Sequence, residues 1–161
     1  MKSWLSEYQH DLAAEFANNS LPHALLISGS PGTGKTELVQ WLAKLIGCDD
    51  VNSEISSSVS NNTKIMPCDQ CKSCHLFAAG THPDQFYHQS ETKSVSVDVS
   101  RLITVFLQKT AQLAKNKVAV VIDAEKMTES AANAILKTLE EPMPHRFIIL
   151  TSNDVDILLP T

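Results

Sequence analysis

Short apolar runs alternate along the chain with amphipathic stretches whose apolar residues recur every three or four positions. Such runs are typical of strands in a parallel sheet, which are buried on both faces by helices. The strands that we predict span 24–28, 85–88, 118–122 and 147–151. The helices that we predict span 3–18, 36–46, a segment capped at Asp98 or Ser100 that runs to about Leu113, and 128–140. Strands that alternate with helices indicate an α/β fold, with a parallel sheet covered on both faces.

Residues 48–80 interrupt this alternation. They contain all four cysteines of the chain and a polar stretch, 52–62, that is rich in Ser and Asn. We predict that 52–62 is a mobile loop, because it has too few apolar residues to pack. We therefore treat about 48–80 as an insertion in one domain that spans 1–161. No helix closes the pattern after the last strand, so we expect the chain to be a fragment of a longer protein.

A glycine-rich segment follows the first predicted strand and opens the next helix. It fits the pattern G-x-x-x-x-G-K-[ST] with the residues Gly29, Ser30, Pro31, Gly32, Thr33, Gly34, Lys35 and Thr36. Glycines let the backbone turn around a phosphate, which successive N–H groups and a helix N-terminus attract. We predict that Lys35 binds the β and γ phosphates of ATP and that Thr36 ligates Mg²⁺. The alternative, an ordinary glycine-rich turn, does not account for the Lys-Thr pair.

The predicted strand over 118–122 ends in an acid, Asp123. Its carboxylate would hold the hydration shell of Mg²⁺, and the alternative is an Asp that caps a helix or lies in a loop. Oligomeric P-loop ATPases usually follow this Asp with a Glu that polarises the attacking water, but here the position is Ala124. Glu125 comes one residue later, and we expect it to point elsewhere. The sequence therefore predicts nucleotide binding with deficient hydrolysis.

The cysteines form a compact array in which two C-x-x-C steps overlap. Thiolates at this spacing, with a fourth from the end of the preceding helix, can surround one Zn²⁺ tetrahedrally. The ligands that we predict are Cys48, Cys68, Cys71 and Cys74. A closed Cys₄ site is structural, because no position stays open for water. Free thiols, a redox disulfide or an iron–sulfur cluster are alternatives, and His75 and His82 are alternative ligands.

Composition narrows the function classes only slightly. The chain has 161 residues, a hydrophobic fraction of 43 % and a net charge of −5. A mildly acidic chain argues against strong autonomous binding to nucleic acid. We expect a cytoplasmic protein, because the N-terminus has no signal peptide and no apolar run approaches the roughly 20 residues of a membrane span.

Several segments together resemble the bacterial clamp-loader subunits of DNA polymerase III, and within them the delta-prime family. The cysteine insertion directly follows the P-loop helix, as it does in that family. The other matching segments are 23–27, 80–84, 123–128 and 131–142. Within the last of these, the residues Asn-Ala-Ile-Leu-Lys-Thr-Leu-Glu-Glu-Pro at 133–142 are highly specific. The resemblance covers essentially all 161 residues.

The resemblance implies an AAA+ fold, in which a small helical lid and a collar domain follow the P-loop domain; both would be absent here. Such subunits form a pentameric ring with gamma/tau and delta subunits and use ATP to load the sliding clamp onto primer–template DNA. ATP-hydrolysing sister subunits carry Asp-Glu where this chain has Asp123-Ala124, which favours delta-prime. The resemblance also implies that Thr151 or Ser152 lies in the region of a sensor for the γ-phosphate. An arginine that acts on the neighbouring subunit would follow Thr161.

Two other functions stay open at this point. One is an ATP-hydrolysing motor subunit of the gamma/tau type, which would use Glu125 or another acid. The other is a zinc-binding module on a P-loop that holds no ligand. Some delta-prime subunits lack the P-loop lysine, but this chain keeps Lys35.

Overall fold

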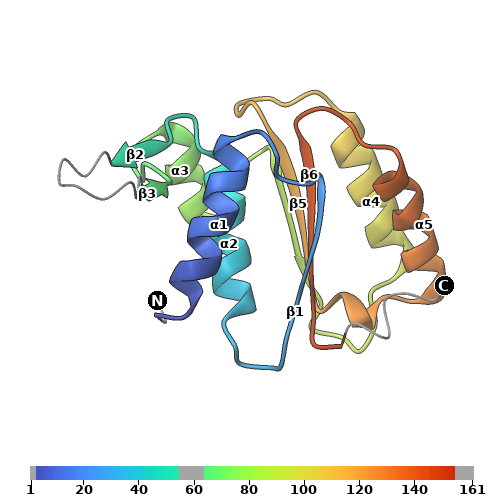
Figure 1. Ribbon diagram of the computed structural model, residues 1–161. Helices are drawn as coiled ribbons and strands as arrows, with labels where there is room; N and C mark the ends of the chain where they lie inside the picture. Colours follow the sequence, from blue (N-terminus) through green and yellow to red (C-terminus); the bar gives the residue numbers. More distant parts are fainter. Residues whose placement is uncertain (1–2, 55–63, 155–161) are drawn as a thin grey trace.

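The computed structural model describes residues 3–54 and 64–154 as an α/β fold (Figure 1). Its elements are α1 (Leu5–Ala17), β1 (Ala24–Ser28), α2 (Lys35–Gly47), β2 (Asn52–Glu54), β3 (Lys64–Met66), α3 (Lys72–Ala78), β4 (Gln85–Gln89), α4 (Val97–Gln108), β5 (Lys117–Ile122), the 3₁₀ turn η1 (Ala124–Lys126), α5 (Glu129–Glu140) and β6 (Arg146–Ser152). Four parallel strands form one sheet in the order β1-β6-β5-β4. Figure 1 shows α1 and α2 on one face and α4 and α5 on the other, so the predicted parallel sheet with two covered faces is confirmed.

The apolar core is split into two layers by the sheet. Alternate residues of β5 point to opposite faces, because side chains in a strand alternate in direction. Val118, Val120 and Ile122 pack with α2, whereas Ala119 and Val121 pack with α4 and α5. Every residue of β5 is buried. The central strand therefore fixes the positions of the helices on both faces.

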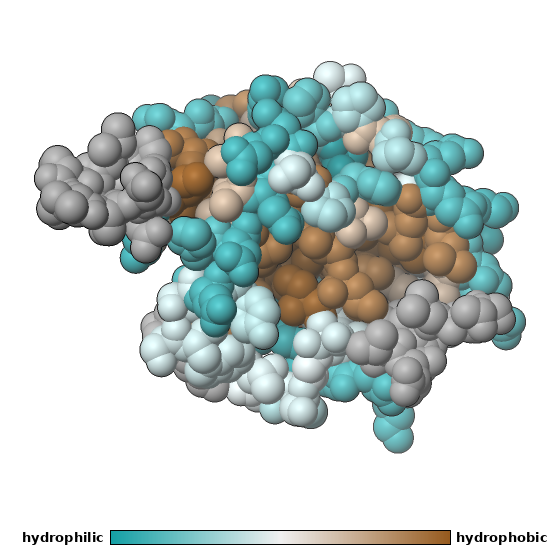
Figure 2. Space-filling view, viewed as in Figure 1, coloured by the Kyte–Doolittle hydropathy of each residue, from teal (hydrophilic) through white to brown (hydrophobic). Residues whose placement is uncertain are grey.

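The first strand is parallel, as predicted, but the prediction that it is buried is wrong. β1 is the outermost strand of the sheet in the described part of the chain, and the side chain of Leu26 is 38 % exposed. Beside it lies an apolar groove of about 150 Å³ between β1 and α5. Figure 2 shows this region as the hydrophobic patch right of centre. Apolar composition alone predicted burial, but burial requires a neighbour on each side, and β1 has one only at β6.

The insertion contains a short hairpin where a loop was predicted. β2 and β3 pair antiparallel, with Asn52 opposite Met66. The prediction of a loop over 52–62 is therefore wrong for Asn52–Glu54, and the rest of that stretch lies outside the described residues. Apolar side chains anchor the insertion, since Val51, Ile65 and Phe77 pack against the core beside α2. The insertion thus shares the core of the domain.

The helix predicted from Asp98 or Ser100 to about Leu113 has different ends. α4 starts at Val97 after the cap residue Ser96, and it ends at Gln108. The chain beyond it is held by Asp84, a carboxylate that is only 1 % exposed. Its oxygens accept backbone N–H groups from Gln112, Leu113 and Ala114 at 2.7–2.8 Å. These bonds replace the helical ones, so the loop after α4 is fixed by a residue far away in the sequence.

The remaining predicted elements agree with the structure to within two residues. α5 begins after Thr128, whose hydroxyl accepts the backbone N–H of Ala131 at 3.1 Å, and it ends before Pro142. Side-chain capping of this kind satisfies one of the N–H groups that a helix leaves unpaired. None of the helices in residues 3–54 and 64–154 is long and apolar enough to cross a membrane.

Candidate functional site

The glycine-rich segment forms a turn between β1 and α2 at the carboxyl end of the sheet (Figure 1). Gly32 and Gly34 have φ values of 76° and 89°, which only glycine adopts without strain. A side chain at Gly34 would also come within 3.0 Å of Leu5 Cδ1. No side chain caps α2, so its first N–H groups remain available for an anion. This conformation fits a loop that binds phosphate.

The ammonium group of Lys35 folds back over this loop. It donates to the carbonyl oxygens of Gly29 and Ser30 at 2.6 and 2.8 Å, and to Asn153 Oδ1 at 2.9 Å. The loop is closed further by Thr33, whose hydroxyl donates to the same Ser30 carbonyl at 2.8 Å. Three acceptors therefore hold the ammonium group of Lys35 over the loop.

Asp123 directly follows β5, which β6 separates from β1, and it is linked to the loop through Asn153. Its backbone has φ 55°, and its N–H donates to Thr151 Oγ1 at 3.0 Å. Its carboxylate accepts from Lys126 Nζ at 3.0 Å and from Asn153 Nδ2 at 3.5 Å. Lys126 therefore balances a charge that a cation would otherwise balance.

The expectation that Glu125 points elsewhere is wrong. Its Oε1 accepts from Asn153 Nδ2 at 2.7 Å, and the same amide contacts Lys35. Its Oε2 is buried and has no hydrogen-bond partner among the described residues. Ala124 instead packs in the apolar layer under α4 and α5 and is fully buried. Glu125 is thus linked to the P-loop lysine through the amide of Asn153.

Asn153, which directly follows β6, reaches the P-loop. The sequence analysis did not identify this residue. Thr151 is buried and contacts the backbone of Asp123. The buried Ser152 uses its carbonyl to accept the Gly29 N–H at 3.1 Å. Of the two candidates for the sensor, neither side chain contacts Lys35, whereas the amide of Asn153 does. A polar residue directly after a strand, at the same sheet edge as the P-loop, was the signal that could have found it.

The four predicted cysteines converge on one point. Their sulfur atoms all lie within 4.8 Å of one another, and the group could hold a metal ion. Cys48 lies 3.5–3.9 Å from the other three, and Cys68 lies 3.9 Å from Cys74. A Zn–S bond of about 2.3 Å in a tetrahedron places sulfurs about 3.8 Å apart. The donor set and its dimensions therefore fit zinc.

Backbone N–H groups point at three of these sulfurs. Those of Cys68, Cys71 and Cys74 each donate to the sulfur of the preceding cysteine at 3.3 Å. The Gln70 N–H is the main cause that lowers the pKa of Cys68 to about 7, whereas burial raises the pKa of Cys48 and of Cys74. Such bonds favour thiolate, the form that binds a metal.

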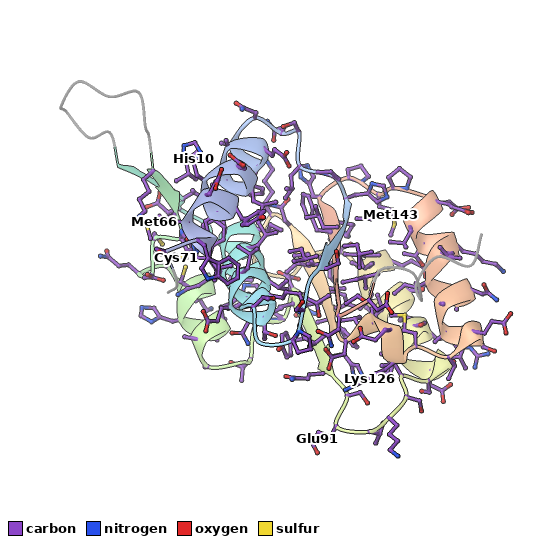
Figure 3. All side chains as sticks on the ribbon, turned by 60° about the horizontal axis from the view of Figure 1, so that its bottom comes forward. His10, Met66, Cys71, Glu91, Lys126 and Met143 are labelled. Carbon is purple, nitrogen blue, oxygen red and sulfur yellow. The ribbon has the colours of Figure 1, made fainter. Side chains whose placement is uncertain are left out.

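Two polar contacts tie the cysteine group to α2. Lys44 pairs with Asp69, and Ser73 Oγ donates to Asp49 Oδ2 at 2.8 Å. The metal-ligand group includes neither His75 nor His82. Figure 3 shows Cys71 beside α2 and α3 and Lys126 near the end of the sheet, well apart. The two candidate sites thus lie at opposite ends of α2, which starts at Lys35 and is followed directly by Cys48.

Comparison with known proteins places the chain in a family. A model of the family described as "DNA polymerase III, delta subunit" matches residues 5–161. The chain belongs to this family. Its curated relatives include the DNA polymerase III subunit delta' of Haemophilus influenzae, which is 39 % identical over 161 residues, and that of Escherichia coli, which is 34 % identical over 160. Each alignment covers 98 % of this chain and 45 % of the relative, so the chain spans less than half the length of these delta' subunits.

A solved structure shares the fold of this chain. It is a DNA polymerase III gamma-subunit-related protein from Thermotoga maritima, with a TM-score of 0.60 and 21 % sequence identity. The likeness covers 94 % of this chain and 42 % of the solved one. The α/β fold with a parallel sheet that was expected from the sequence is therefore shared with this protein.

Proposed function

We propose that this protein is a delta-prime subunit of the DNA polymerase III clamp loader and that its P-loop binds ATP with Mg²⁺ but hydrolyses it poorly. Membership of the delta-prime family supports the first part. The intact P-loop supports the second, and the observation that carries it is the position of Lys35 over the loop. A resident nucleotide would supply phosphates in place of the backbone carbonyls that Lys35 now contacts.

The chain's own residues would divide the work of binding. The loop from Gly29 to Thr36 surrounds the phosphates with N–H groups, and the N-terminus of α2 adds its positive dipole end. Thr36 and Asp123 would hold Mg²⁺ and its waters. Lys126 contacts only Oδ2 of Asp123, so Oδ1 could accept from the waters of the cation.

Poor hydrolysis follows from the residues beside Asp123. The place of the usual water-polarising Glu is taken by Ala124, a buried methyl group. ATP hydrolysis in the ring then belongs to other subunits, of the gamma/tau type. This protein would work with them and with delta, in a pentameric cytoplasmic assembly that loads the sliding clamp onto primer–template DNA. A lid and a collar beyond 161 would complete the subunit.

The cysteine group supports a structural zinc ion. All four ligands come from this chain, and no open position is left for water. Native mass spectrometry is expected to find one zinc ion per chain, and four reactive thiols without metal would contradict this. Zinc would hold the insertion against α2 rather than take part in a reaction.

A titration with ATP and Mg²⁺ tests the nucleotide site. The variant Lys35→Ala should bind ATP about 30-fold more weakly, because one hydrogen bond to a charged group contributes about 2 kcal/mol. The matched control is Lys44→Ala on the same helix, which pairs with Asp69 and should leave ATP binding unchanged. Equal affinities for Lys35→Ala and the unmutated protein would refute nucleotide binding at this loop.

Hydrolysis is tested by phosphate release from the protein alone. We expect a rate far below that of a gamma-type subunit assayed beside it. A comparable rate would favour the motor-subunit alternative.

A further inference from the structure

Glu125 reaches the P-loop through one amide group, and none of the roles above uses it. Asn153 stands between two charges, since its Oδ1 accepts from Lys35 Nζ at 2.9 Å and its Nδ2 donates to Glu125 Oε1 at 2.7 Å. A second carboxylate, that of Asp123, lies 3.5 Å from the same Nδ2. The amide therefore lies in a chain of hydrogen bonds with a cation at one end and anions at the other.

The polarity of this chain permits one orientation of Asn153. An ammonium group only donates hydrogen bonds, and an ionised carboxylate only accepts them. If the amide turned over, its oxygen would face Glu125 and its NH₂ group would face Lys35, so both bonds would be lost. Glu125 and Lys35 together thus direct the oxygen of Asn153 toward the P-loop.

This orientation matters for the third phosphate of a nucleotide. The P-loop lysine contacts the β and γ phosphates, so a group bonded to Lys35 lies next to the γ position. When Lys35 turns to the phosphates, Glu125 still holds Nδ2, and Asn153 still presents an oxygen. Phosphate oxygens are acceptors too, so no hydrogen bond forms between them and Oδ1.

We propose that Glu125 is a specificity-determining residue, which orients Asn153 so that this P-loop prefers a nucleoside diphosphate to a triphosphate. The inference rests on the proposed nucleotide binding. It names ADP as the ligand that the site holds more tightly. A site that retains ADP suits a subunit that binds nucleotide without turning it over.

Competition between ADP and ATP in the presence of Mg²⁺ tests the proposal. The variant Glu125→Gln keeps the shape but can donate to Asn153 Oδ1, so that Nδ2 is free to face the γ-phosphate. We expect the unmutated protein to bind ADP more tightly than ATP. In Glu125→Gln the ratio of the two dissociation constants should shift toward ATP about 30-fold, the factor for one hydrogen bond to a charged group. The matched control Glu129→Gln removes an exposed acid from the start of α5 and should leave the ratio unchanged.

A double-mutant cycle separates orientation from simple charge repulsion. In an Asn153→Ala background, Glu125→Gln should no longer shift the ratio, because the group that Glu125 orients is gone. A shift that persists there would overturn the role of Asn153. An unchanged ratio in Glu125→Gln alone, or tighter binding of ATP by the unmutated protein, would overturn the proposal.

A measurement without nucleotide keeps the two proposals distinguishable. The side-chain amide signal of Asn153 in the NMR spectrum should move in Glu125→Gln and stay in place in Glu129→Gln. If it moves but neither ADP nor ATP binds, nucleotide binding itself is refuted, and the preference with it. If nucleotides bind but the signal does not move, only the orientation by Glu125 is refuted.

Discussion

The two ends of α2 differ in how they are arranged to hold a ligand. At its start, glycines with positive φ and a helix end without a side-chain cap leave backbone donors for a ligand, and Lys35 is held by contacts that a phosphate can replace. After its end, Cys48 joins three other cysteines in a group whose ligands all come from the chain. The arrangement at the first end suits a ligand that exchanges, and the arrangement at the second end suits a metal ion that stays bound. One rigid helix can therefore bind an exchangeable ligand at its start while its other end is held permanently by the cysteine group.

The largest expected effect tests whether the cysteine end is independent of the P-loop end. Cys74 is 2 % exposed, and Cys74→Ser should abolish zinc binding and lower the free energy of unfolding by about 4 kcal/mol or more. Native mass spectrometry and denaturant unfolding measure the two effects. The neighbouring His75→Ala lies outside the ligand group and is the control. If the folded fraction of Cys74→Ser no longer bound ATP, the two ends would be coupled and the comparison would fail.

The next effect concerns the neighbourhood of the P-loop. Ala124 is fully buried in the layer under α4 and α5, so Ala124→Glu should place an unpaired carboxylate in apolar surroundings. We expect it to lower the free energy of unfolding by about 3 kcal/mol or more and not to increase hydrolysis. Thermal unfolding and phosphate release measure the outcome, with Ala124→Ser as the small polar control. A stable variant that hydrolyses ATP faster would show that residue 124 can turn toward the phosphates.

A smaller effect is expected far from both sites, at Asp84. Burial raises its pKa, but the N–H groups of Gln112, Leu113 and Ala114 outweigh burial and hold the pKa below the usual value. A lowered pKa adds stability above about pH 4, where the unfolded chain is also ionised, and this stability is lost as the pH falls through the folded value.

The variant Asp84→Asn should therefore lower the free energy of unfolding at neutral pH by about 2 kcal/mol. It should also flatten the loss of stability in acid, which unfolding curves between pH 7 and pH 3 would show. Zinc content and ATP affinity should stay unchanged. A variant with the original acid profile would mean that these N–H bonds do not stabilise the ionised form.

The features that the sequence predicted well depend on residues that lie close together along the chain. The P-loop and the three clustered cysteines lie in contiguous segments, and residue type and spacing alone determine their geometry. Three strands, β1, β5 and β6, were recognised because each contains an uninterrupted apolar run. The contacts of Asn153, Glu125 and Asp84 were missed, because they join segments 28 to 118 residues apart and follow no periodic pattern. The start of α4 and the β2–β3 pairing were missed for a related reason, since short polar segments carry weak signals.

The exposed side of β1 affects how the protein behaves in concentrated solution. An outer strand offers a row of unpaired backbone donors and acceptors; among residues 3–54 and 64–154 none pairs with the outer side of β1, and the surface beside it is apolar. Two copies of the 161-residue chain could satisfy both needs by pairing their β1 strands. Purified chain is therefore expected to dimerise or precipitate as its concentration rises, and exchanging Leu26→Lys at this edge should make it more soluble.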